Sequence, residues 1–438
     1  MSRVSPRQTA DFLVALADAL ERNTDAIVAA NAADLSKLDP SDYRYDRLKL
    51  DPARIAAIAS DTRNVAMLPA PCGEVIDEVT RPNGLRISRV RVPMGVIGVI
   101  YEARPNVTID VVSIGLRSGN AVVLKGGSDA HQSNVALVGV VHDVLKGQGL
   151  DPDLVQLLPD GHDSANELMN AVGYVDLLIP RGSKRLIDSV RQNAKIPVIE
   201  TGASVVHTYF DKDGDLQKGK AVICNAKTRR ISVCNALDCV LIHKDRLPDL
   251  AALCQPLAEK GVELRADGRA YDALDGRYPK EMLLHIQPDD YGMEYLALKL
   301  AIVTVNDIDE ALQYIYDHSL KHSEAIVTES QEAAERFLSE VDAACCYVNA
   351  STAFTDGAQF GLGAEIGIST QKMHARGPMG LKELTSYKWL IRGDVGTGRK
   401  NRRETSSQPQ KIKRQNSYDY NAQKSRARRL RKRADNRR

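Results

Sequence analysis

The chain has 438 residues, of which 43% are apolar, and this length suggests two or three domains with sizeable cores. It contains no run of about 18 uncharged apolar residues, and its N-terminus lacks the apolar core of a signal peptide. Its seven cysteines are irregularly spread without a CxxC pair, so neither a metal site nor a disulfide framework is indicated. We therefore expect a soluble, cytoplasmic protein, in a reducing compartment that can keep a catalytic thiol free.

The net charge of +2 combines two very different parts of the chain. Residues 396–438 contain 16 Lys and Arg against 3 Asp and Glu, whereas residues 1–395 contain 43 basic and 54 acidic side chains. The basic segment has no apolar period, so we expect a disordered tail that cannot fold alone. Its arginines could bind nucleic acid or another polyanion through counterion release, which is the less favoured interpretation.

The chain begins with helical patterns, because apolar residues recur at helical spacing over 8–38 and over 52–66. A hairpin should follow, since Val75–Val79 and Leu85–Val92 alternate in polarity around an Asn-Gly turn. Apolar strands are then predicted at 95–100, 121–125, 176–179 and 197–199, with helices at 133–145 and 184–193. This alternation predicts a doubly wound α/β domain that binds ligands at the carboxyl ends of its strands.

Two glycine-containing turns follow these strands, at 126–128 and at 180–183. No GxGxxG motif is present, but backbone N–H groups at such turns could still hold phosphates. A second α/β segment should run to about Val348, with a strand at 300–305 and helices at 307–317 and 330–340. A glycine-rich stretch at 354–363 and short strands at 366–370 and 387–391 complete the pattern.

Cys234 is the most reactive candidate on the chain, because three cations, Lys227, Arg229 and Arg230, precede it closely. Nearby positive charge lowers the pKa of a thiol and favours the nucleophilic thiolate. The same cations could receive an anionic leaving group. Taken alone, the cysteine is more readily interpreted as a structural residue at the edge of the strand that follows it.

Long motifs then reveal a resemblance. They are Val92–Asn106, Asn225–Asn235, Tyr347–Thr352, Phe360–Glu365 and Ser369–Leu381. Over residues 1–395 the chain resembles the glutamate-5-semialdehyde dehydrogenases, or gamma-glutamyl phosphate reductases, of the aldehyde dehydrogenase superfamily. The resemblance implies an aldehyde dehydrogenase-like α/β fold with a doubly wound cofactor domain, an α/β catalytic domain and a small oligomerisation hairpin element.

The resemblance also divides the chain. It implies an NADP-binding domain at 1–204 with 349–365, a catalytic domain at 205–348, and an oligomerisation element at 76–91 and 366–395. The basic tail at 396–438 is not part of the family pattern. Because the hairpin of superfamily members pairs with a neighbouring subunit, a homo-oligomer is implied, and functional coupling to a glutamate 5-kinase is a further partner suggestion.

The implied activity is NADPH-dependent reduction of L-glutamyl 5-phosphate to L-glutamate 5-semialdehyde and phosphate, the second step of proline biosynthesis. Cys234 would displace phosphate to form a thioester, and hydride transfer would give a thiohemiacetal that collapses to the aldehyde. Asn106 matches the side-chain amide that superfamily members aim at the carbonyl oxygen, with the Cys234 backbone N–H as second donor. A fixed donor of this kind contributes roughly 3–4 kcal/mol.

Five residues match cofactor positions. Lys125 stands where superfamily members hold the adenosine ribose or its phosphate. Ser128 replaces the carboxylate that NAD-preferring relatives tend to have, which favours NADPH, although Asp129 lies next to it. Gly182 and Ser183 match the turn near the pyrophosphate. Glu294 resembles the acid that holds the nicotinamide ribose, with a solvated glutamate beside a helix as the alternative.

Four residues are candidates for the substrate. Lys227 and Arg230 could meet the departing phosphate. His374 and Arg376 lie in a family motif and could meet the α-carboxylate, with an oligomer-interface role equally open. Ala353 stands where the family often has Arg, so another group must serve any anion that this Arg would bind.

Two rival functions remain. Glu200 precedes Cys234 at the spacing of the water-activating base of aldehyde dehydrogenases, which supports an enzyme that oxidises a free aldehyde. A reductase must avoid hydrolysing its thioester, so we expect no such role for Glu200 here. The second rival is a polyanion-binding protein whose functional part is the basic tail.

Overall fold

The computed structural model describes residues 1, 3–40, 42–102 and 104–393. Our expectations for the basic tail at 396–438 therefore lie outside the described residues. The chain divides into two compact units. The larger contains residues 1–78 and 88–390, and the described part of the smaller contains residues 79–87 and 391–393.

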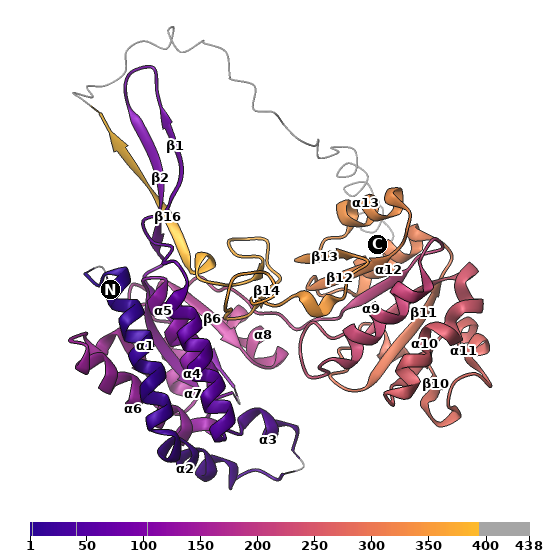
Figure 1. Cartoon of the computed structure of the whole chain (residues 1–438), viewed down its shortest axis with the longest axis horizontal. Coiled ribbons are helices and arrows are strands. Elements are labelled where there is room, and N and C mark those ends of the chain that lie inside the picture. Colours follow the sequence, from indigo (N-terminus) through magenta and orange to yellow (C-terminus); the bar gives the residue numbers. More distant parts are fainter. Residues whose placement is uncertain (2, 41, 103, 394–438) are drawn as a thin grey trace, which may run out of the picture. The chain divides into compact units, whose positions relative to one another are not determined.

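Four helices precede the first sheet: α1 (Pro6–Arg22), α2 (Thr24–Leu35), α3 (Tyr43–Leu48) and α4 (Pro52–Met67). The predicted helical region at 8–38 is thus divided, because α1 ends at Arg22 and the backbone N–H of the next residue, Asn23, donates to two preceding carbonyls. Asp51 caps α4 by accepting a hydrogen bond from the backbone N–H of Arg54, which confirms the predicted helix at 52–66. In Figure 1, α1, α4 and α5 pack against one another and α2 packs against α6.

The first large sheet is parallel, in the order β5-β4-β3-β6. Its strands are β3 (Val96–Tyr101), β4 (Ala121–Gly126), β5 (Val155–Leu157) and β6 (Leu177–Arg181). Helices α5 (Asn106–Arg117), α6 (His131–Gly147), α7 (His162–Met169) and α8 (Lys184–Asn193) connect or follow them. Val99 belongs to the core on one face and Ile100 to the core on the other, as alternation along a strand requires. This confirms the doubly wound domain.

One predicted strand did not form. Residues 197–199 make only an isolated bridge, between Leu178 and Val198. The N–H of Leu178 donates to Pro197 O and the N–H of Ile199 donates to Leu178 O, so pairing stops after two hydrogen bonds. Pro197 has no N–H with which to extend the pairing in the other direction.

The second large sheet is also parallel, in the order β10-β9-β11-β8-β7-β12-β13. Its strands are β7 (His207–Phe210), β8 (Cys239–His243), β9 (Glu263–Ala266), β10 (Leu283–His285), β11 (Lys299–Val305), β12 (Ser323–Val327) and β13 (Cys345–Val348). Its helices are α9 (Leu216–Thr228), α10 (Leu250–Glu259), α11 (Gly268–Leu274), α12 (Ile308–His318) and α13 (Gln331–Glu340). The predicted second α/β segment is confirmed.

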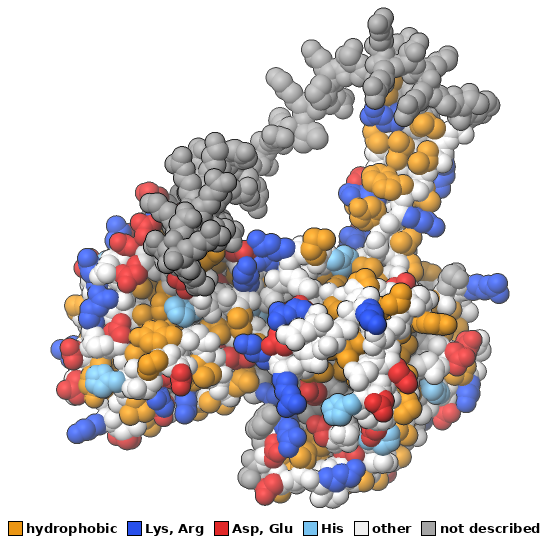
Figure 2. Space-filling model, turned by 180° about the vertical axis from the view of Figure 1, so that it is seen from behind, with side chains coloured by type: hydrophobic (Ala, Val, Ile, Leu, Met, Phe, Trp, Pro, Cys, Tyr) orange, Lys and Arg blue, Asp and Glu red, His pale blue; other side chains and the backbone are white. Residues whose placement is uncertain are grey.

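Two small sheets complete the fold. The predicted hairpin pairs with the last strand in the order β1-β2-β16, formed by β1 (Val75–Thr80), β2 (Arg86–Pro93) and β16 (Thr385–Arg392). The other sheet joins β14 (Ile368–Ser369) to β15 (Gly377–Pro378). On β16 the side chains of Tyr387 and Trp389 are 49% and 52% exposed, and Figure 2 shows apolar side chains gathered along this three-stranded sheet.

The C-terminal part of the larger unit packs into the first core. Ile366, Met379 and Leu384 are buried in the same cluster as the helices α1 and α5. The side-chain amide of Asn120 donates to Leu384 O at 2.9 Å. The domain limits stay a prediction, although this packing draws residues 366–384 towards the first sheet. In the part of the chain that the structure describes, no helix has the length and apolarity to cross a membrane.

Candidate active site

Cys234 lies in the turn between the end of α9 and the start of β8. Its backbone carbonyl accepts a hydrogen bond from the Ser204 hydroxyl, which also lies 3.2 Å from Glu294 Oε1. Ser204 is fully buried and precedes β7. One hydroxyl therefore links the backbone of the candidate nucleophile to the carboxylate predicted to hold the nicotinamide ribose.

Burial dominates the electrostatics of the Cys234 thiol. The side chain is half-buried, and burial raises its pKa to about 11. Arg181 and Arg104 lower this pKa, whereas Glu365 and Glu294 raise it. None of the three cations that precede Cys234 in the sequence is among the charges that most affect the thiol. Our expectation that they lower its pKa is therefore wrong for the protein without substrate.

Each of the three cations that precede Cys234 has a different environment in the structure. Lys227 is fully buried on α9, its ammonium donates to Leu237 O at 2.9 Å, and burial lowers its pKa to about 8. This enclosure argues against our expectation that Lys227 receives the departing phosphate. Arg229 donates to the backbone carbonyl of Ala353 at 3.2 Å, so a guanidinium does reach the position where the family often has Arg. Arg230 is exposed and its charge lowers the pKa of Arg104.

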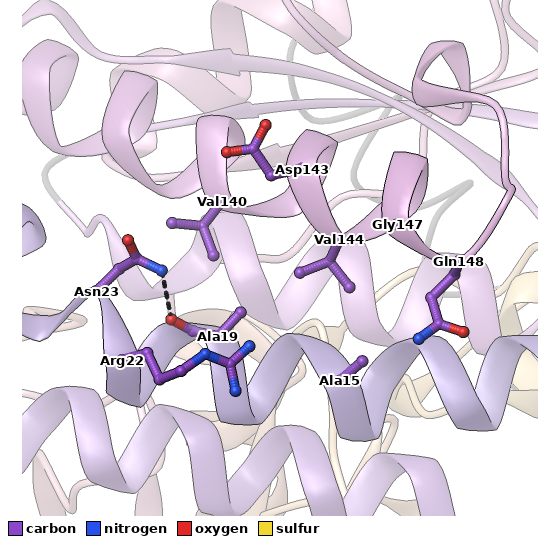
Figure 3. A pocket seen from close by; sticks show the side chains of 9 residues that line it. All are labelled: Ala15, Ala19, Arg22, Asn23, Val140, Asp143, Val144, Gly147 and Gln148. Atoms are coloured by element: carbon purple, nitrogen blue, oxygen red, sulfur yellow. Dashed lines mark hydrogen bonds between the residues drawn. The ribbon is translucent and has the colours of Figure 1, made fainter.

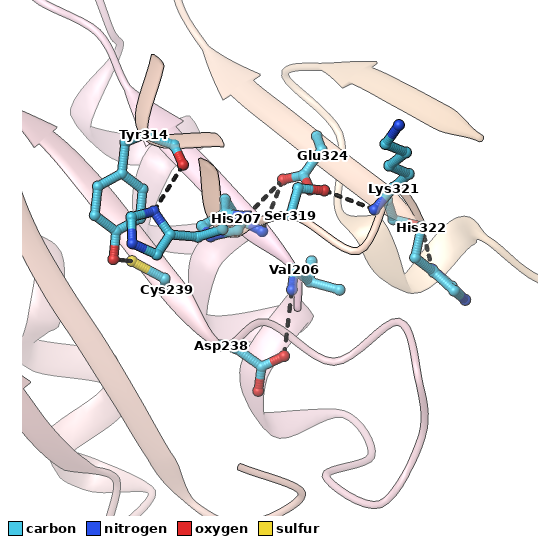
Figure 4. A network of polar contacts seen from close by, with 11 residues as sticks. Val206, His207, Asp238, Cys239, Tyr314, Ser319, Lys321, His322 and Glu324 are labelled. Carbon is cyan, nitrogen blue, oxygen red and sulfur yellow. Dashed lines mark hydrogen bonds and ion pairs between the residues drawn. The ribbon is translucent and has the colours of Figure 1, made fainter. Parts of the chain in front are cut away.

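Asp238 ties two segments of the site together, and the sequence analysis missed it. Its carboxylate accepts a hydrogen bond from the backbone N–H of Val206 at 3.3 Å (Figure 4). It accepts a second one from the backbone N–H of Tyr295 at 3.1 Å. Val206 is two residues from Ser204, and Tyr295 follows Glu294 directly. Burial raises the pKa of Asp238 to about 6, against the opposing charge of Lys227. A buried carboxylate between two loops is a signal that sequence alone does not give.

Asn106 begins α5, directly beyond β3 and its loop. Its Nδ2 donates to Asp110 Oδ2 at 3.0 Å, which leaves the second N–H of the amide for another acceptor. Burial raises the pKa of Asp110 to about 6, although Arg181 and Asn106 oppose the rise. The role of Asn106 at the carbonyl oxygen stays a prediction.

Two arginines converge on the site from neighbouring strands. Tyr101 at the end of β3 pairs with Arg181 at the end of β6, and the backbone N–H of Glu102 donates to Arg181 O at 3.1 Å. Arg104 follows three residues after Tyr101 and is half-buried. The sequence analysis quoted Arg104 and Arg181 as letters of their motifs but gave them no role. Their position after two adjacent parallel strands was the available signal.

Lys125 lies near the end of β4, and Ser128 lies in the turn that follows this strand. Lys125 is 6% exposed, and its ammonium donates to Gly126 O at 2.7 Å. Burial lowers its pKa, against the nearby charges of Asp160 and Asp129. Ser128 is exposed, at the start of a short 3-10 helix (Ser128–Ala130).

The turn after β6 already holds an anionic group. The Ser183 hydroxyl caps α8 by accepting from the N–H of Leu186 at 3.3 Å. The N–H of Ser183 donates to the Glu102 carboxylate at 2.8 Å. A Cβ added at Gly182 would collide with the same carboxylate. The donors of this turn suit an anion, but the Glu102 carboxylate takes them in this structure, so the pyrophosphate position near Gly182 and Ser183 stays a prediction.

Two carboxyl groups adjoin the thiol. Burial raises the pKa of Glu294, while Ser204, Arg47 and Lys184 lower it. Burial raises the pKa of Glu365 to about 7, and its Oε2 is a buried atom without a hydrogen-bond partner in the described residues. Glu365 belongs to a quoted motif, but the sequence analysis gave it no role.

His374 and Arg376 lie elsewhere. His374 is exposed, with Nε2 2.6 Å from Glu383 O. Arg376 donates to Asp342 at 2.9 Å, and Lys321 and Lys372 pair with the same carboxylate at 3.1 and 3.0 Å. These partners hold the pKa of Asp342 far below its usual range, although burial opposes them. The cluster favours a structural role for Arg376 over a contact with the substrate.

Glu200 has a partner of its own. Its carboxylate lies 3.7 Å from the Arg191 guanidinium, and its backbone N–H donates to Gln371 Oε1 at 3.0 Å. Burial raises the pKa of Glu200, and Arg191 lowers it. Glu200 is not among the charges that most affect Cys234. Both observations agree with our doubt that it activates water.

Two of the cavities among the described residues have volumes of about 310 Å³ each. One opens beside Glu294 and is lined by Arg265, Asp290 and Lys299 among others. The other lies between α1 and α6 (Figure 3) and contains none of the predicted site residues. Among the described residues no cluster of three His, Cys, Asp or Glu side chains could hold a metal ion.

Comparison with known proteins places the chain and its fold in one family. A sequence model of the aldehyde dehydrogenase family matches residues 1–272. The gamma-glutamyl phosphate reductase of Pelodictyon phaeoclathratiforme is 58% identical over 386 residues, which are 88% of this chain and 92% of that protein. The protein of the same name from Bacteroides thetaiotaomicron is also 58% identical, over 88% of this chain and 93% of its own.

Solved structures agree. The gamma-glutamyl phosphate reductase of Thermotoga maritima is 40% identical and superposes with a TM-score of 0.86, covering 91% of this chain and 96% of that one. An acetylating aldehyde dehydrogenase from Geobacillus thermoglucosidasius has the same fold, with 14% identity and a TM-score of 0.65 over 91% of this chain and 94% of its own. The chain belongs to the aldehyde dehydrogenase family and, within it, to the gamma-glutamyl phosphate reductases.

Proposed function

We propose that this chain reduces L-glutamyl 5-phosphate to L-glutamate 5-semialdehyde and phosphate, with NADPH, as the second step of proline biosynthesis. The observation that carries the proposal is the site around Cys234. A cysteine in the turn before β8, linked through Ser204 to Glu294, is flanked by Arg104 and Arg181 from the first sheet. The identity of 58% to gamma-glutamyl phosphate reductases over most of both chains supports the same reaction.

Cys234 performs the covalent step. Its sulfur attacks the carbonyl carbon of the acyl phosphate, phosphate leaves, and a thioester forms on the protein. The second amide N–H of Asn106 and the backbone N–H of Cys234 are the donors for the oxygen that becomes negative. Arg230, which is exposed near Arg104, is a candidate partner of the phosphate.

The described residues fit a nicotinamide cofactor. The turn at Gly182 and Ser183 binds a carboxylate at the N-terminus of α8, where a pyrophosphate would find the same donors. Glu294 is the acceptor for the ribose hydroxyls, held beside Cys234 by Ser204. When bound, the cofactor supplies the hydride that reduces the thioester. Lys125 and the small, neutral, exposed Ser128 in the turn after β4 support a preference for NADPH over NADH.

The test is the reverse reaction, followed as NADP⁺ reduction in the presence of glutamate-5-semialdehyde and inorganic phosphate. Cys234→Ser should abolish turnover while NADP⁺ binding persists. Cys224→Ser is the matched control, because Cys224 is a half-buried cysteine on the preceding helix α9. NADP⁺ reduction that does not require phosphate would favour the rival aldehyde oxidation and would refute the proposed reaction.

The same family membership supports a homo-oligomer. The exposed Tyr387 and Trp389 on β16 are apolar groups that a second subunit could cover. Light scattering of Trp389→Glu against the wild type tests this, and an unchanged molar mass would argue against the role of this strand. Functional coupling to a glutamate 5-kinase stays a suggestion of the resemblance.

A further inference from the structure

Arg104 is a half-buried cation without a partner. It makes no hydrogen bond and no ion pair within the part of the chain that the structure describes. The positive charges of three further arginines, Arg181, Arg47 and Arg230, act on its guanidinium. Burial and these like charges lower its pKa to about 10, and only the Cys234 thiolate opposes them among its main interactions. A guanidinium in this position is stabilised when an anion joins it.

The surrounding backbone also suits an anion. Arg104 lies between the end of β3 and the start of α5, and the residue that caps α5, Pro105, offers no side-chain hydrogen bond. Helix N-termini favour negative charge. Arg181 approaches from the neighbouring strand, and its guanidinium lies so close to Gly367 that a Cβ there would collide with it. Glycine at 367 therefore leaves the second arginine room beside the site.

The two arginines differ in how far their charge is already balanced. Arg181 interacts with the carboxyl groups of Asp110 and Glu365 as well as with the thiol. No carboxylate is among the main interactions of Arg104. The charge of Arg104 is therefore available to a doubly charged ligand, whereas the charge of Arg181 is already partly balanced by carboxyl groups.

We propose that Arg104, supported by Arg181, binds the phosphoryl group of the acyl phosphate substrate, and inorganic phosphate in the reverse reaction. This inference rests on the proposed function. The phosphoryl group is bonded through oxygen to the carbon that Cys234 attacks, so it must lie next to the sulfur with which Arg104 interacts. The α-carboxylate lies several bonds further along the substrate.

The step is balanced without any further reactant. The Cys234 thiol gives up its proton, its Sγ electron pair forms a bond to the carbonyl carbon, and the bond from that carbon to the phosphate oxygen breaks. The electron pair of that bond leaves on the phosphate, and Arg104 neutralises the charge that develops there. The phosphate takes up one proton as it leaves, so the proton count is unchanged. In reverse, a phosphate oxygen held by Arg104 attacks the thioester, and the thiolate leaves. No atom changes oxidation state in either direction.

The first test is steady-state kinetics of the reverse reaction with phosphate varied. Arg104→Gln should raise the KM for phosphate about 10- to 100-fold, because a hydrogen bond to a charged group contributes about that factor. The KM values for NADP⁺ and for the semialdehyde should stay within about threefold. Arg104→Lys keeps the positive charge but loses the planar guanidinium that can donate two parallel hydrogen bonds. Its KM for phosphate should therefore lie between those of the wild type and Arg104→Gln. Arg277→Gln, an exposed arginine elsewhere, is the control.

The second test does not depend on turnover. Saturating inorganic phosphate should slow alkylation of Cys234 by iodoacetamide in the wild type and in Arg277→Gln, but not in Arg104→Gln. An unchanged KM for phosphate in Arg104→Gln, or a rise confined to the KM for the semialdehyde, would overturn the proposal. A wild type that reduces NADP⁺ without phosphate would instead refute the proposed function, while the alkylation comparison still decides whether Arg104 binds phosphate.

Discussion

The thiol of Cys234 should titrate near pH 11 in the protein without substrate, about two units above a free cysteine. Burial outweighs the two arginines, and this difference corresponds to roughly 3 kcal/mol against the thiolate. At pH 8 about one molecule in a thousand then carries the thiolate. The rate of alkylation by iodoacetamide should therefore rise about tenfold for each pH unit between 7 and 10.

Two substitutions should move this pKa in opposite directions. Arg181→Gln removes a charge that lowers the pKa, so alkylation should slow at every pH. Glu365→Gln removes a charge that raises it, so alkylation should accelerate. Because the pKa of Glu365 is about 7, its carboxyl is neutral at lower pH and this acceleration should vanish there.

The assay is a timed reaction with iodoacetamide, quenched and followed by mass spectrometry of the peptide that contains Cys234. The peptide that contains Cys224 provides an internal reference, and circular dichroism checks that both variants are folded. A rate that levels off below pH 9 would refute the dominance of burial. Shifts of both variants in the same direction would refute the assignment of the neighbouring charges.

Three further outcomes are expected. Glu200→Gln should keep the reductive rate within about tenfold, because its carboxylate pairs with Arg191, and NADPH consumption at saturating substrate measures this. Ser128→Glu should shift the ratio of kcat/KM towards NADH, since a carboxylate would repel a 2′-phosphate; an unchanged ratio would show that this turn does not meet the ribose. Asp238→Asn points amide hydrogens at one of the two backbone N–H groups that the carboxylate accepts, so the free energy of unfolding measured in urea should fall by about 1–3 kcal/mol. The KM for NADPH should rise as well. Wild-type values of both would show that Asp238 does not hold the two segments together.

Much of the fold could be predicted because its parallel strands are short, uninterrupted apolar runs. The runs at 95–100, 121–125 and 300–305 became β3, β4 and β11. The same criterion failed at 197–199, where Pro197 limits pairing to a single bridge. The division of 8–38 into α1 and α2 also escaped prediction, since Asn23 interrupts the helix without interrupting the apolar pattern.

The site was predictable where it depends on motifs and not where it depends on packing. The motif identified Cys234, but nearness in sequence misidentified its neighbours. Each residue of a helix is rotated by about 100° from the last, and α9 turns Lys227 into the core. Two arginines that lower the pKa of the thiol are distant from it in the sequence: Arg181 ends β6, and Arg104 follows the neighbouring strand β3. Only the topology brings them to it.

The burial of Ile366, Met379 and Leu384 in the first core has a consequence for synthesis of the chain on the ribosome. The first sheet and its helices are translated early, yet Ile366, Met379 and Leu384 emerge roughly 170 residues after Ile199, or on the order of 10–30 s later. During that interval the apolar sites that these side chains will fill remain open to water. The first core can therefore reach its final packing only when translation is nearly complete, and we expect the nascent N-terminal half to expose apolar surface until then.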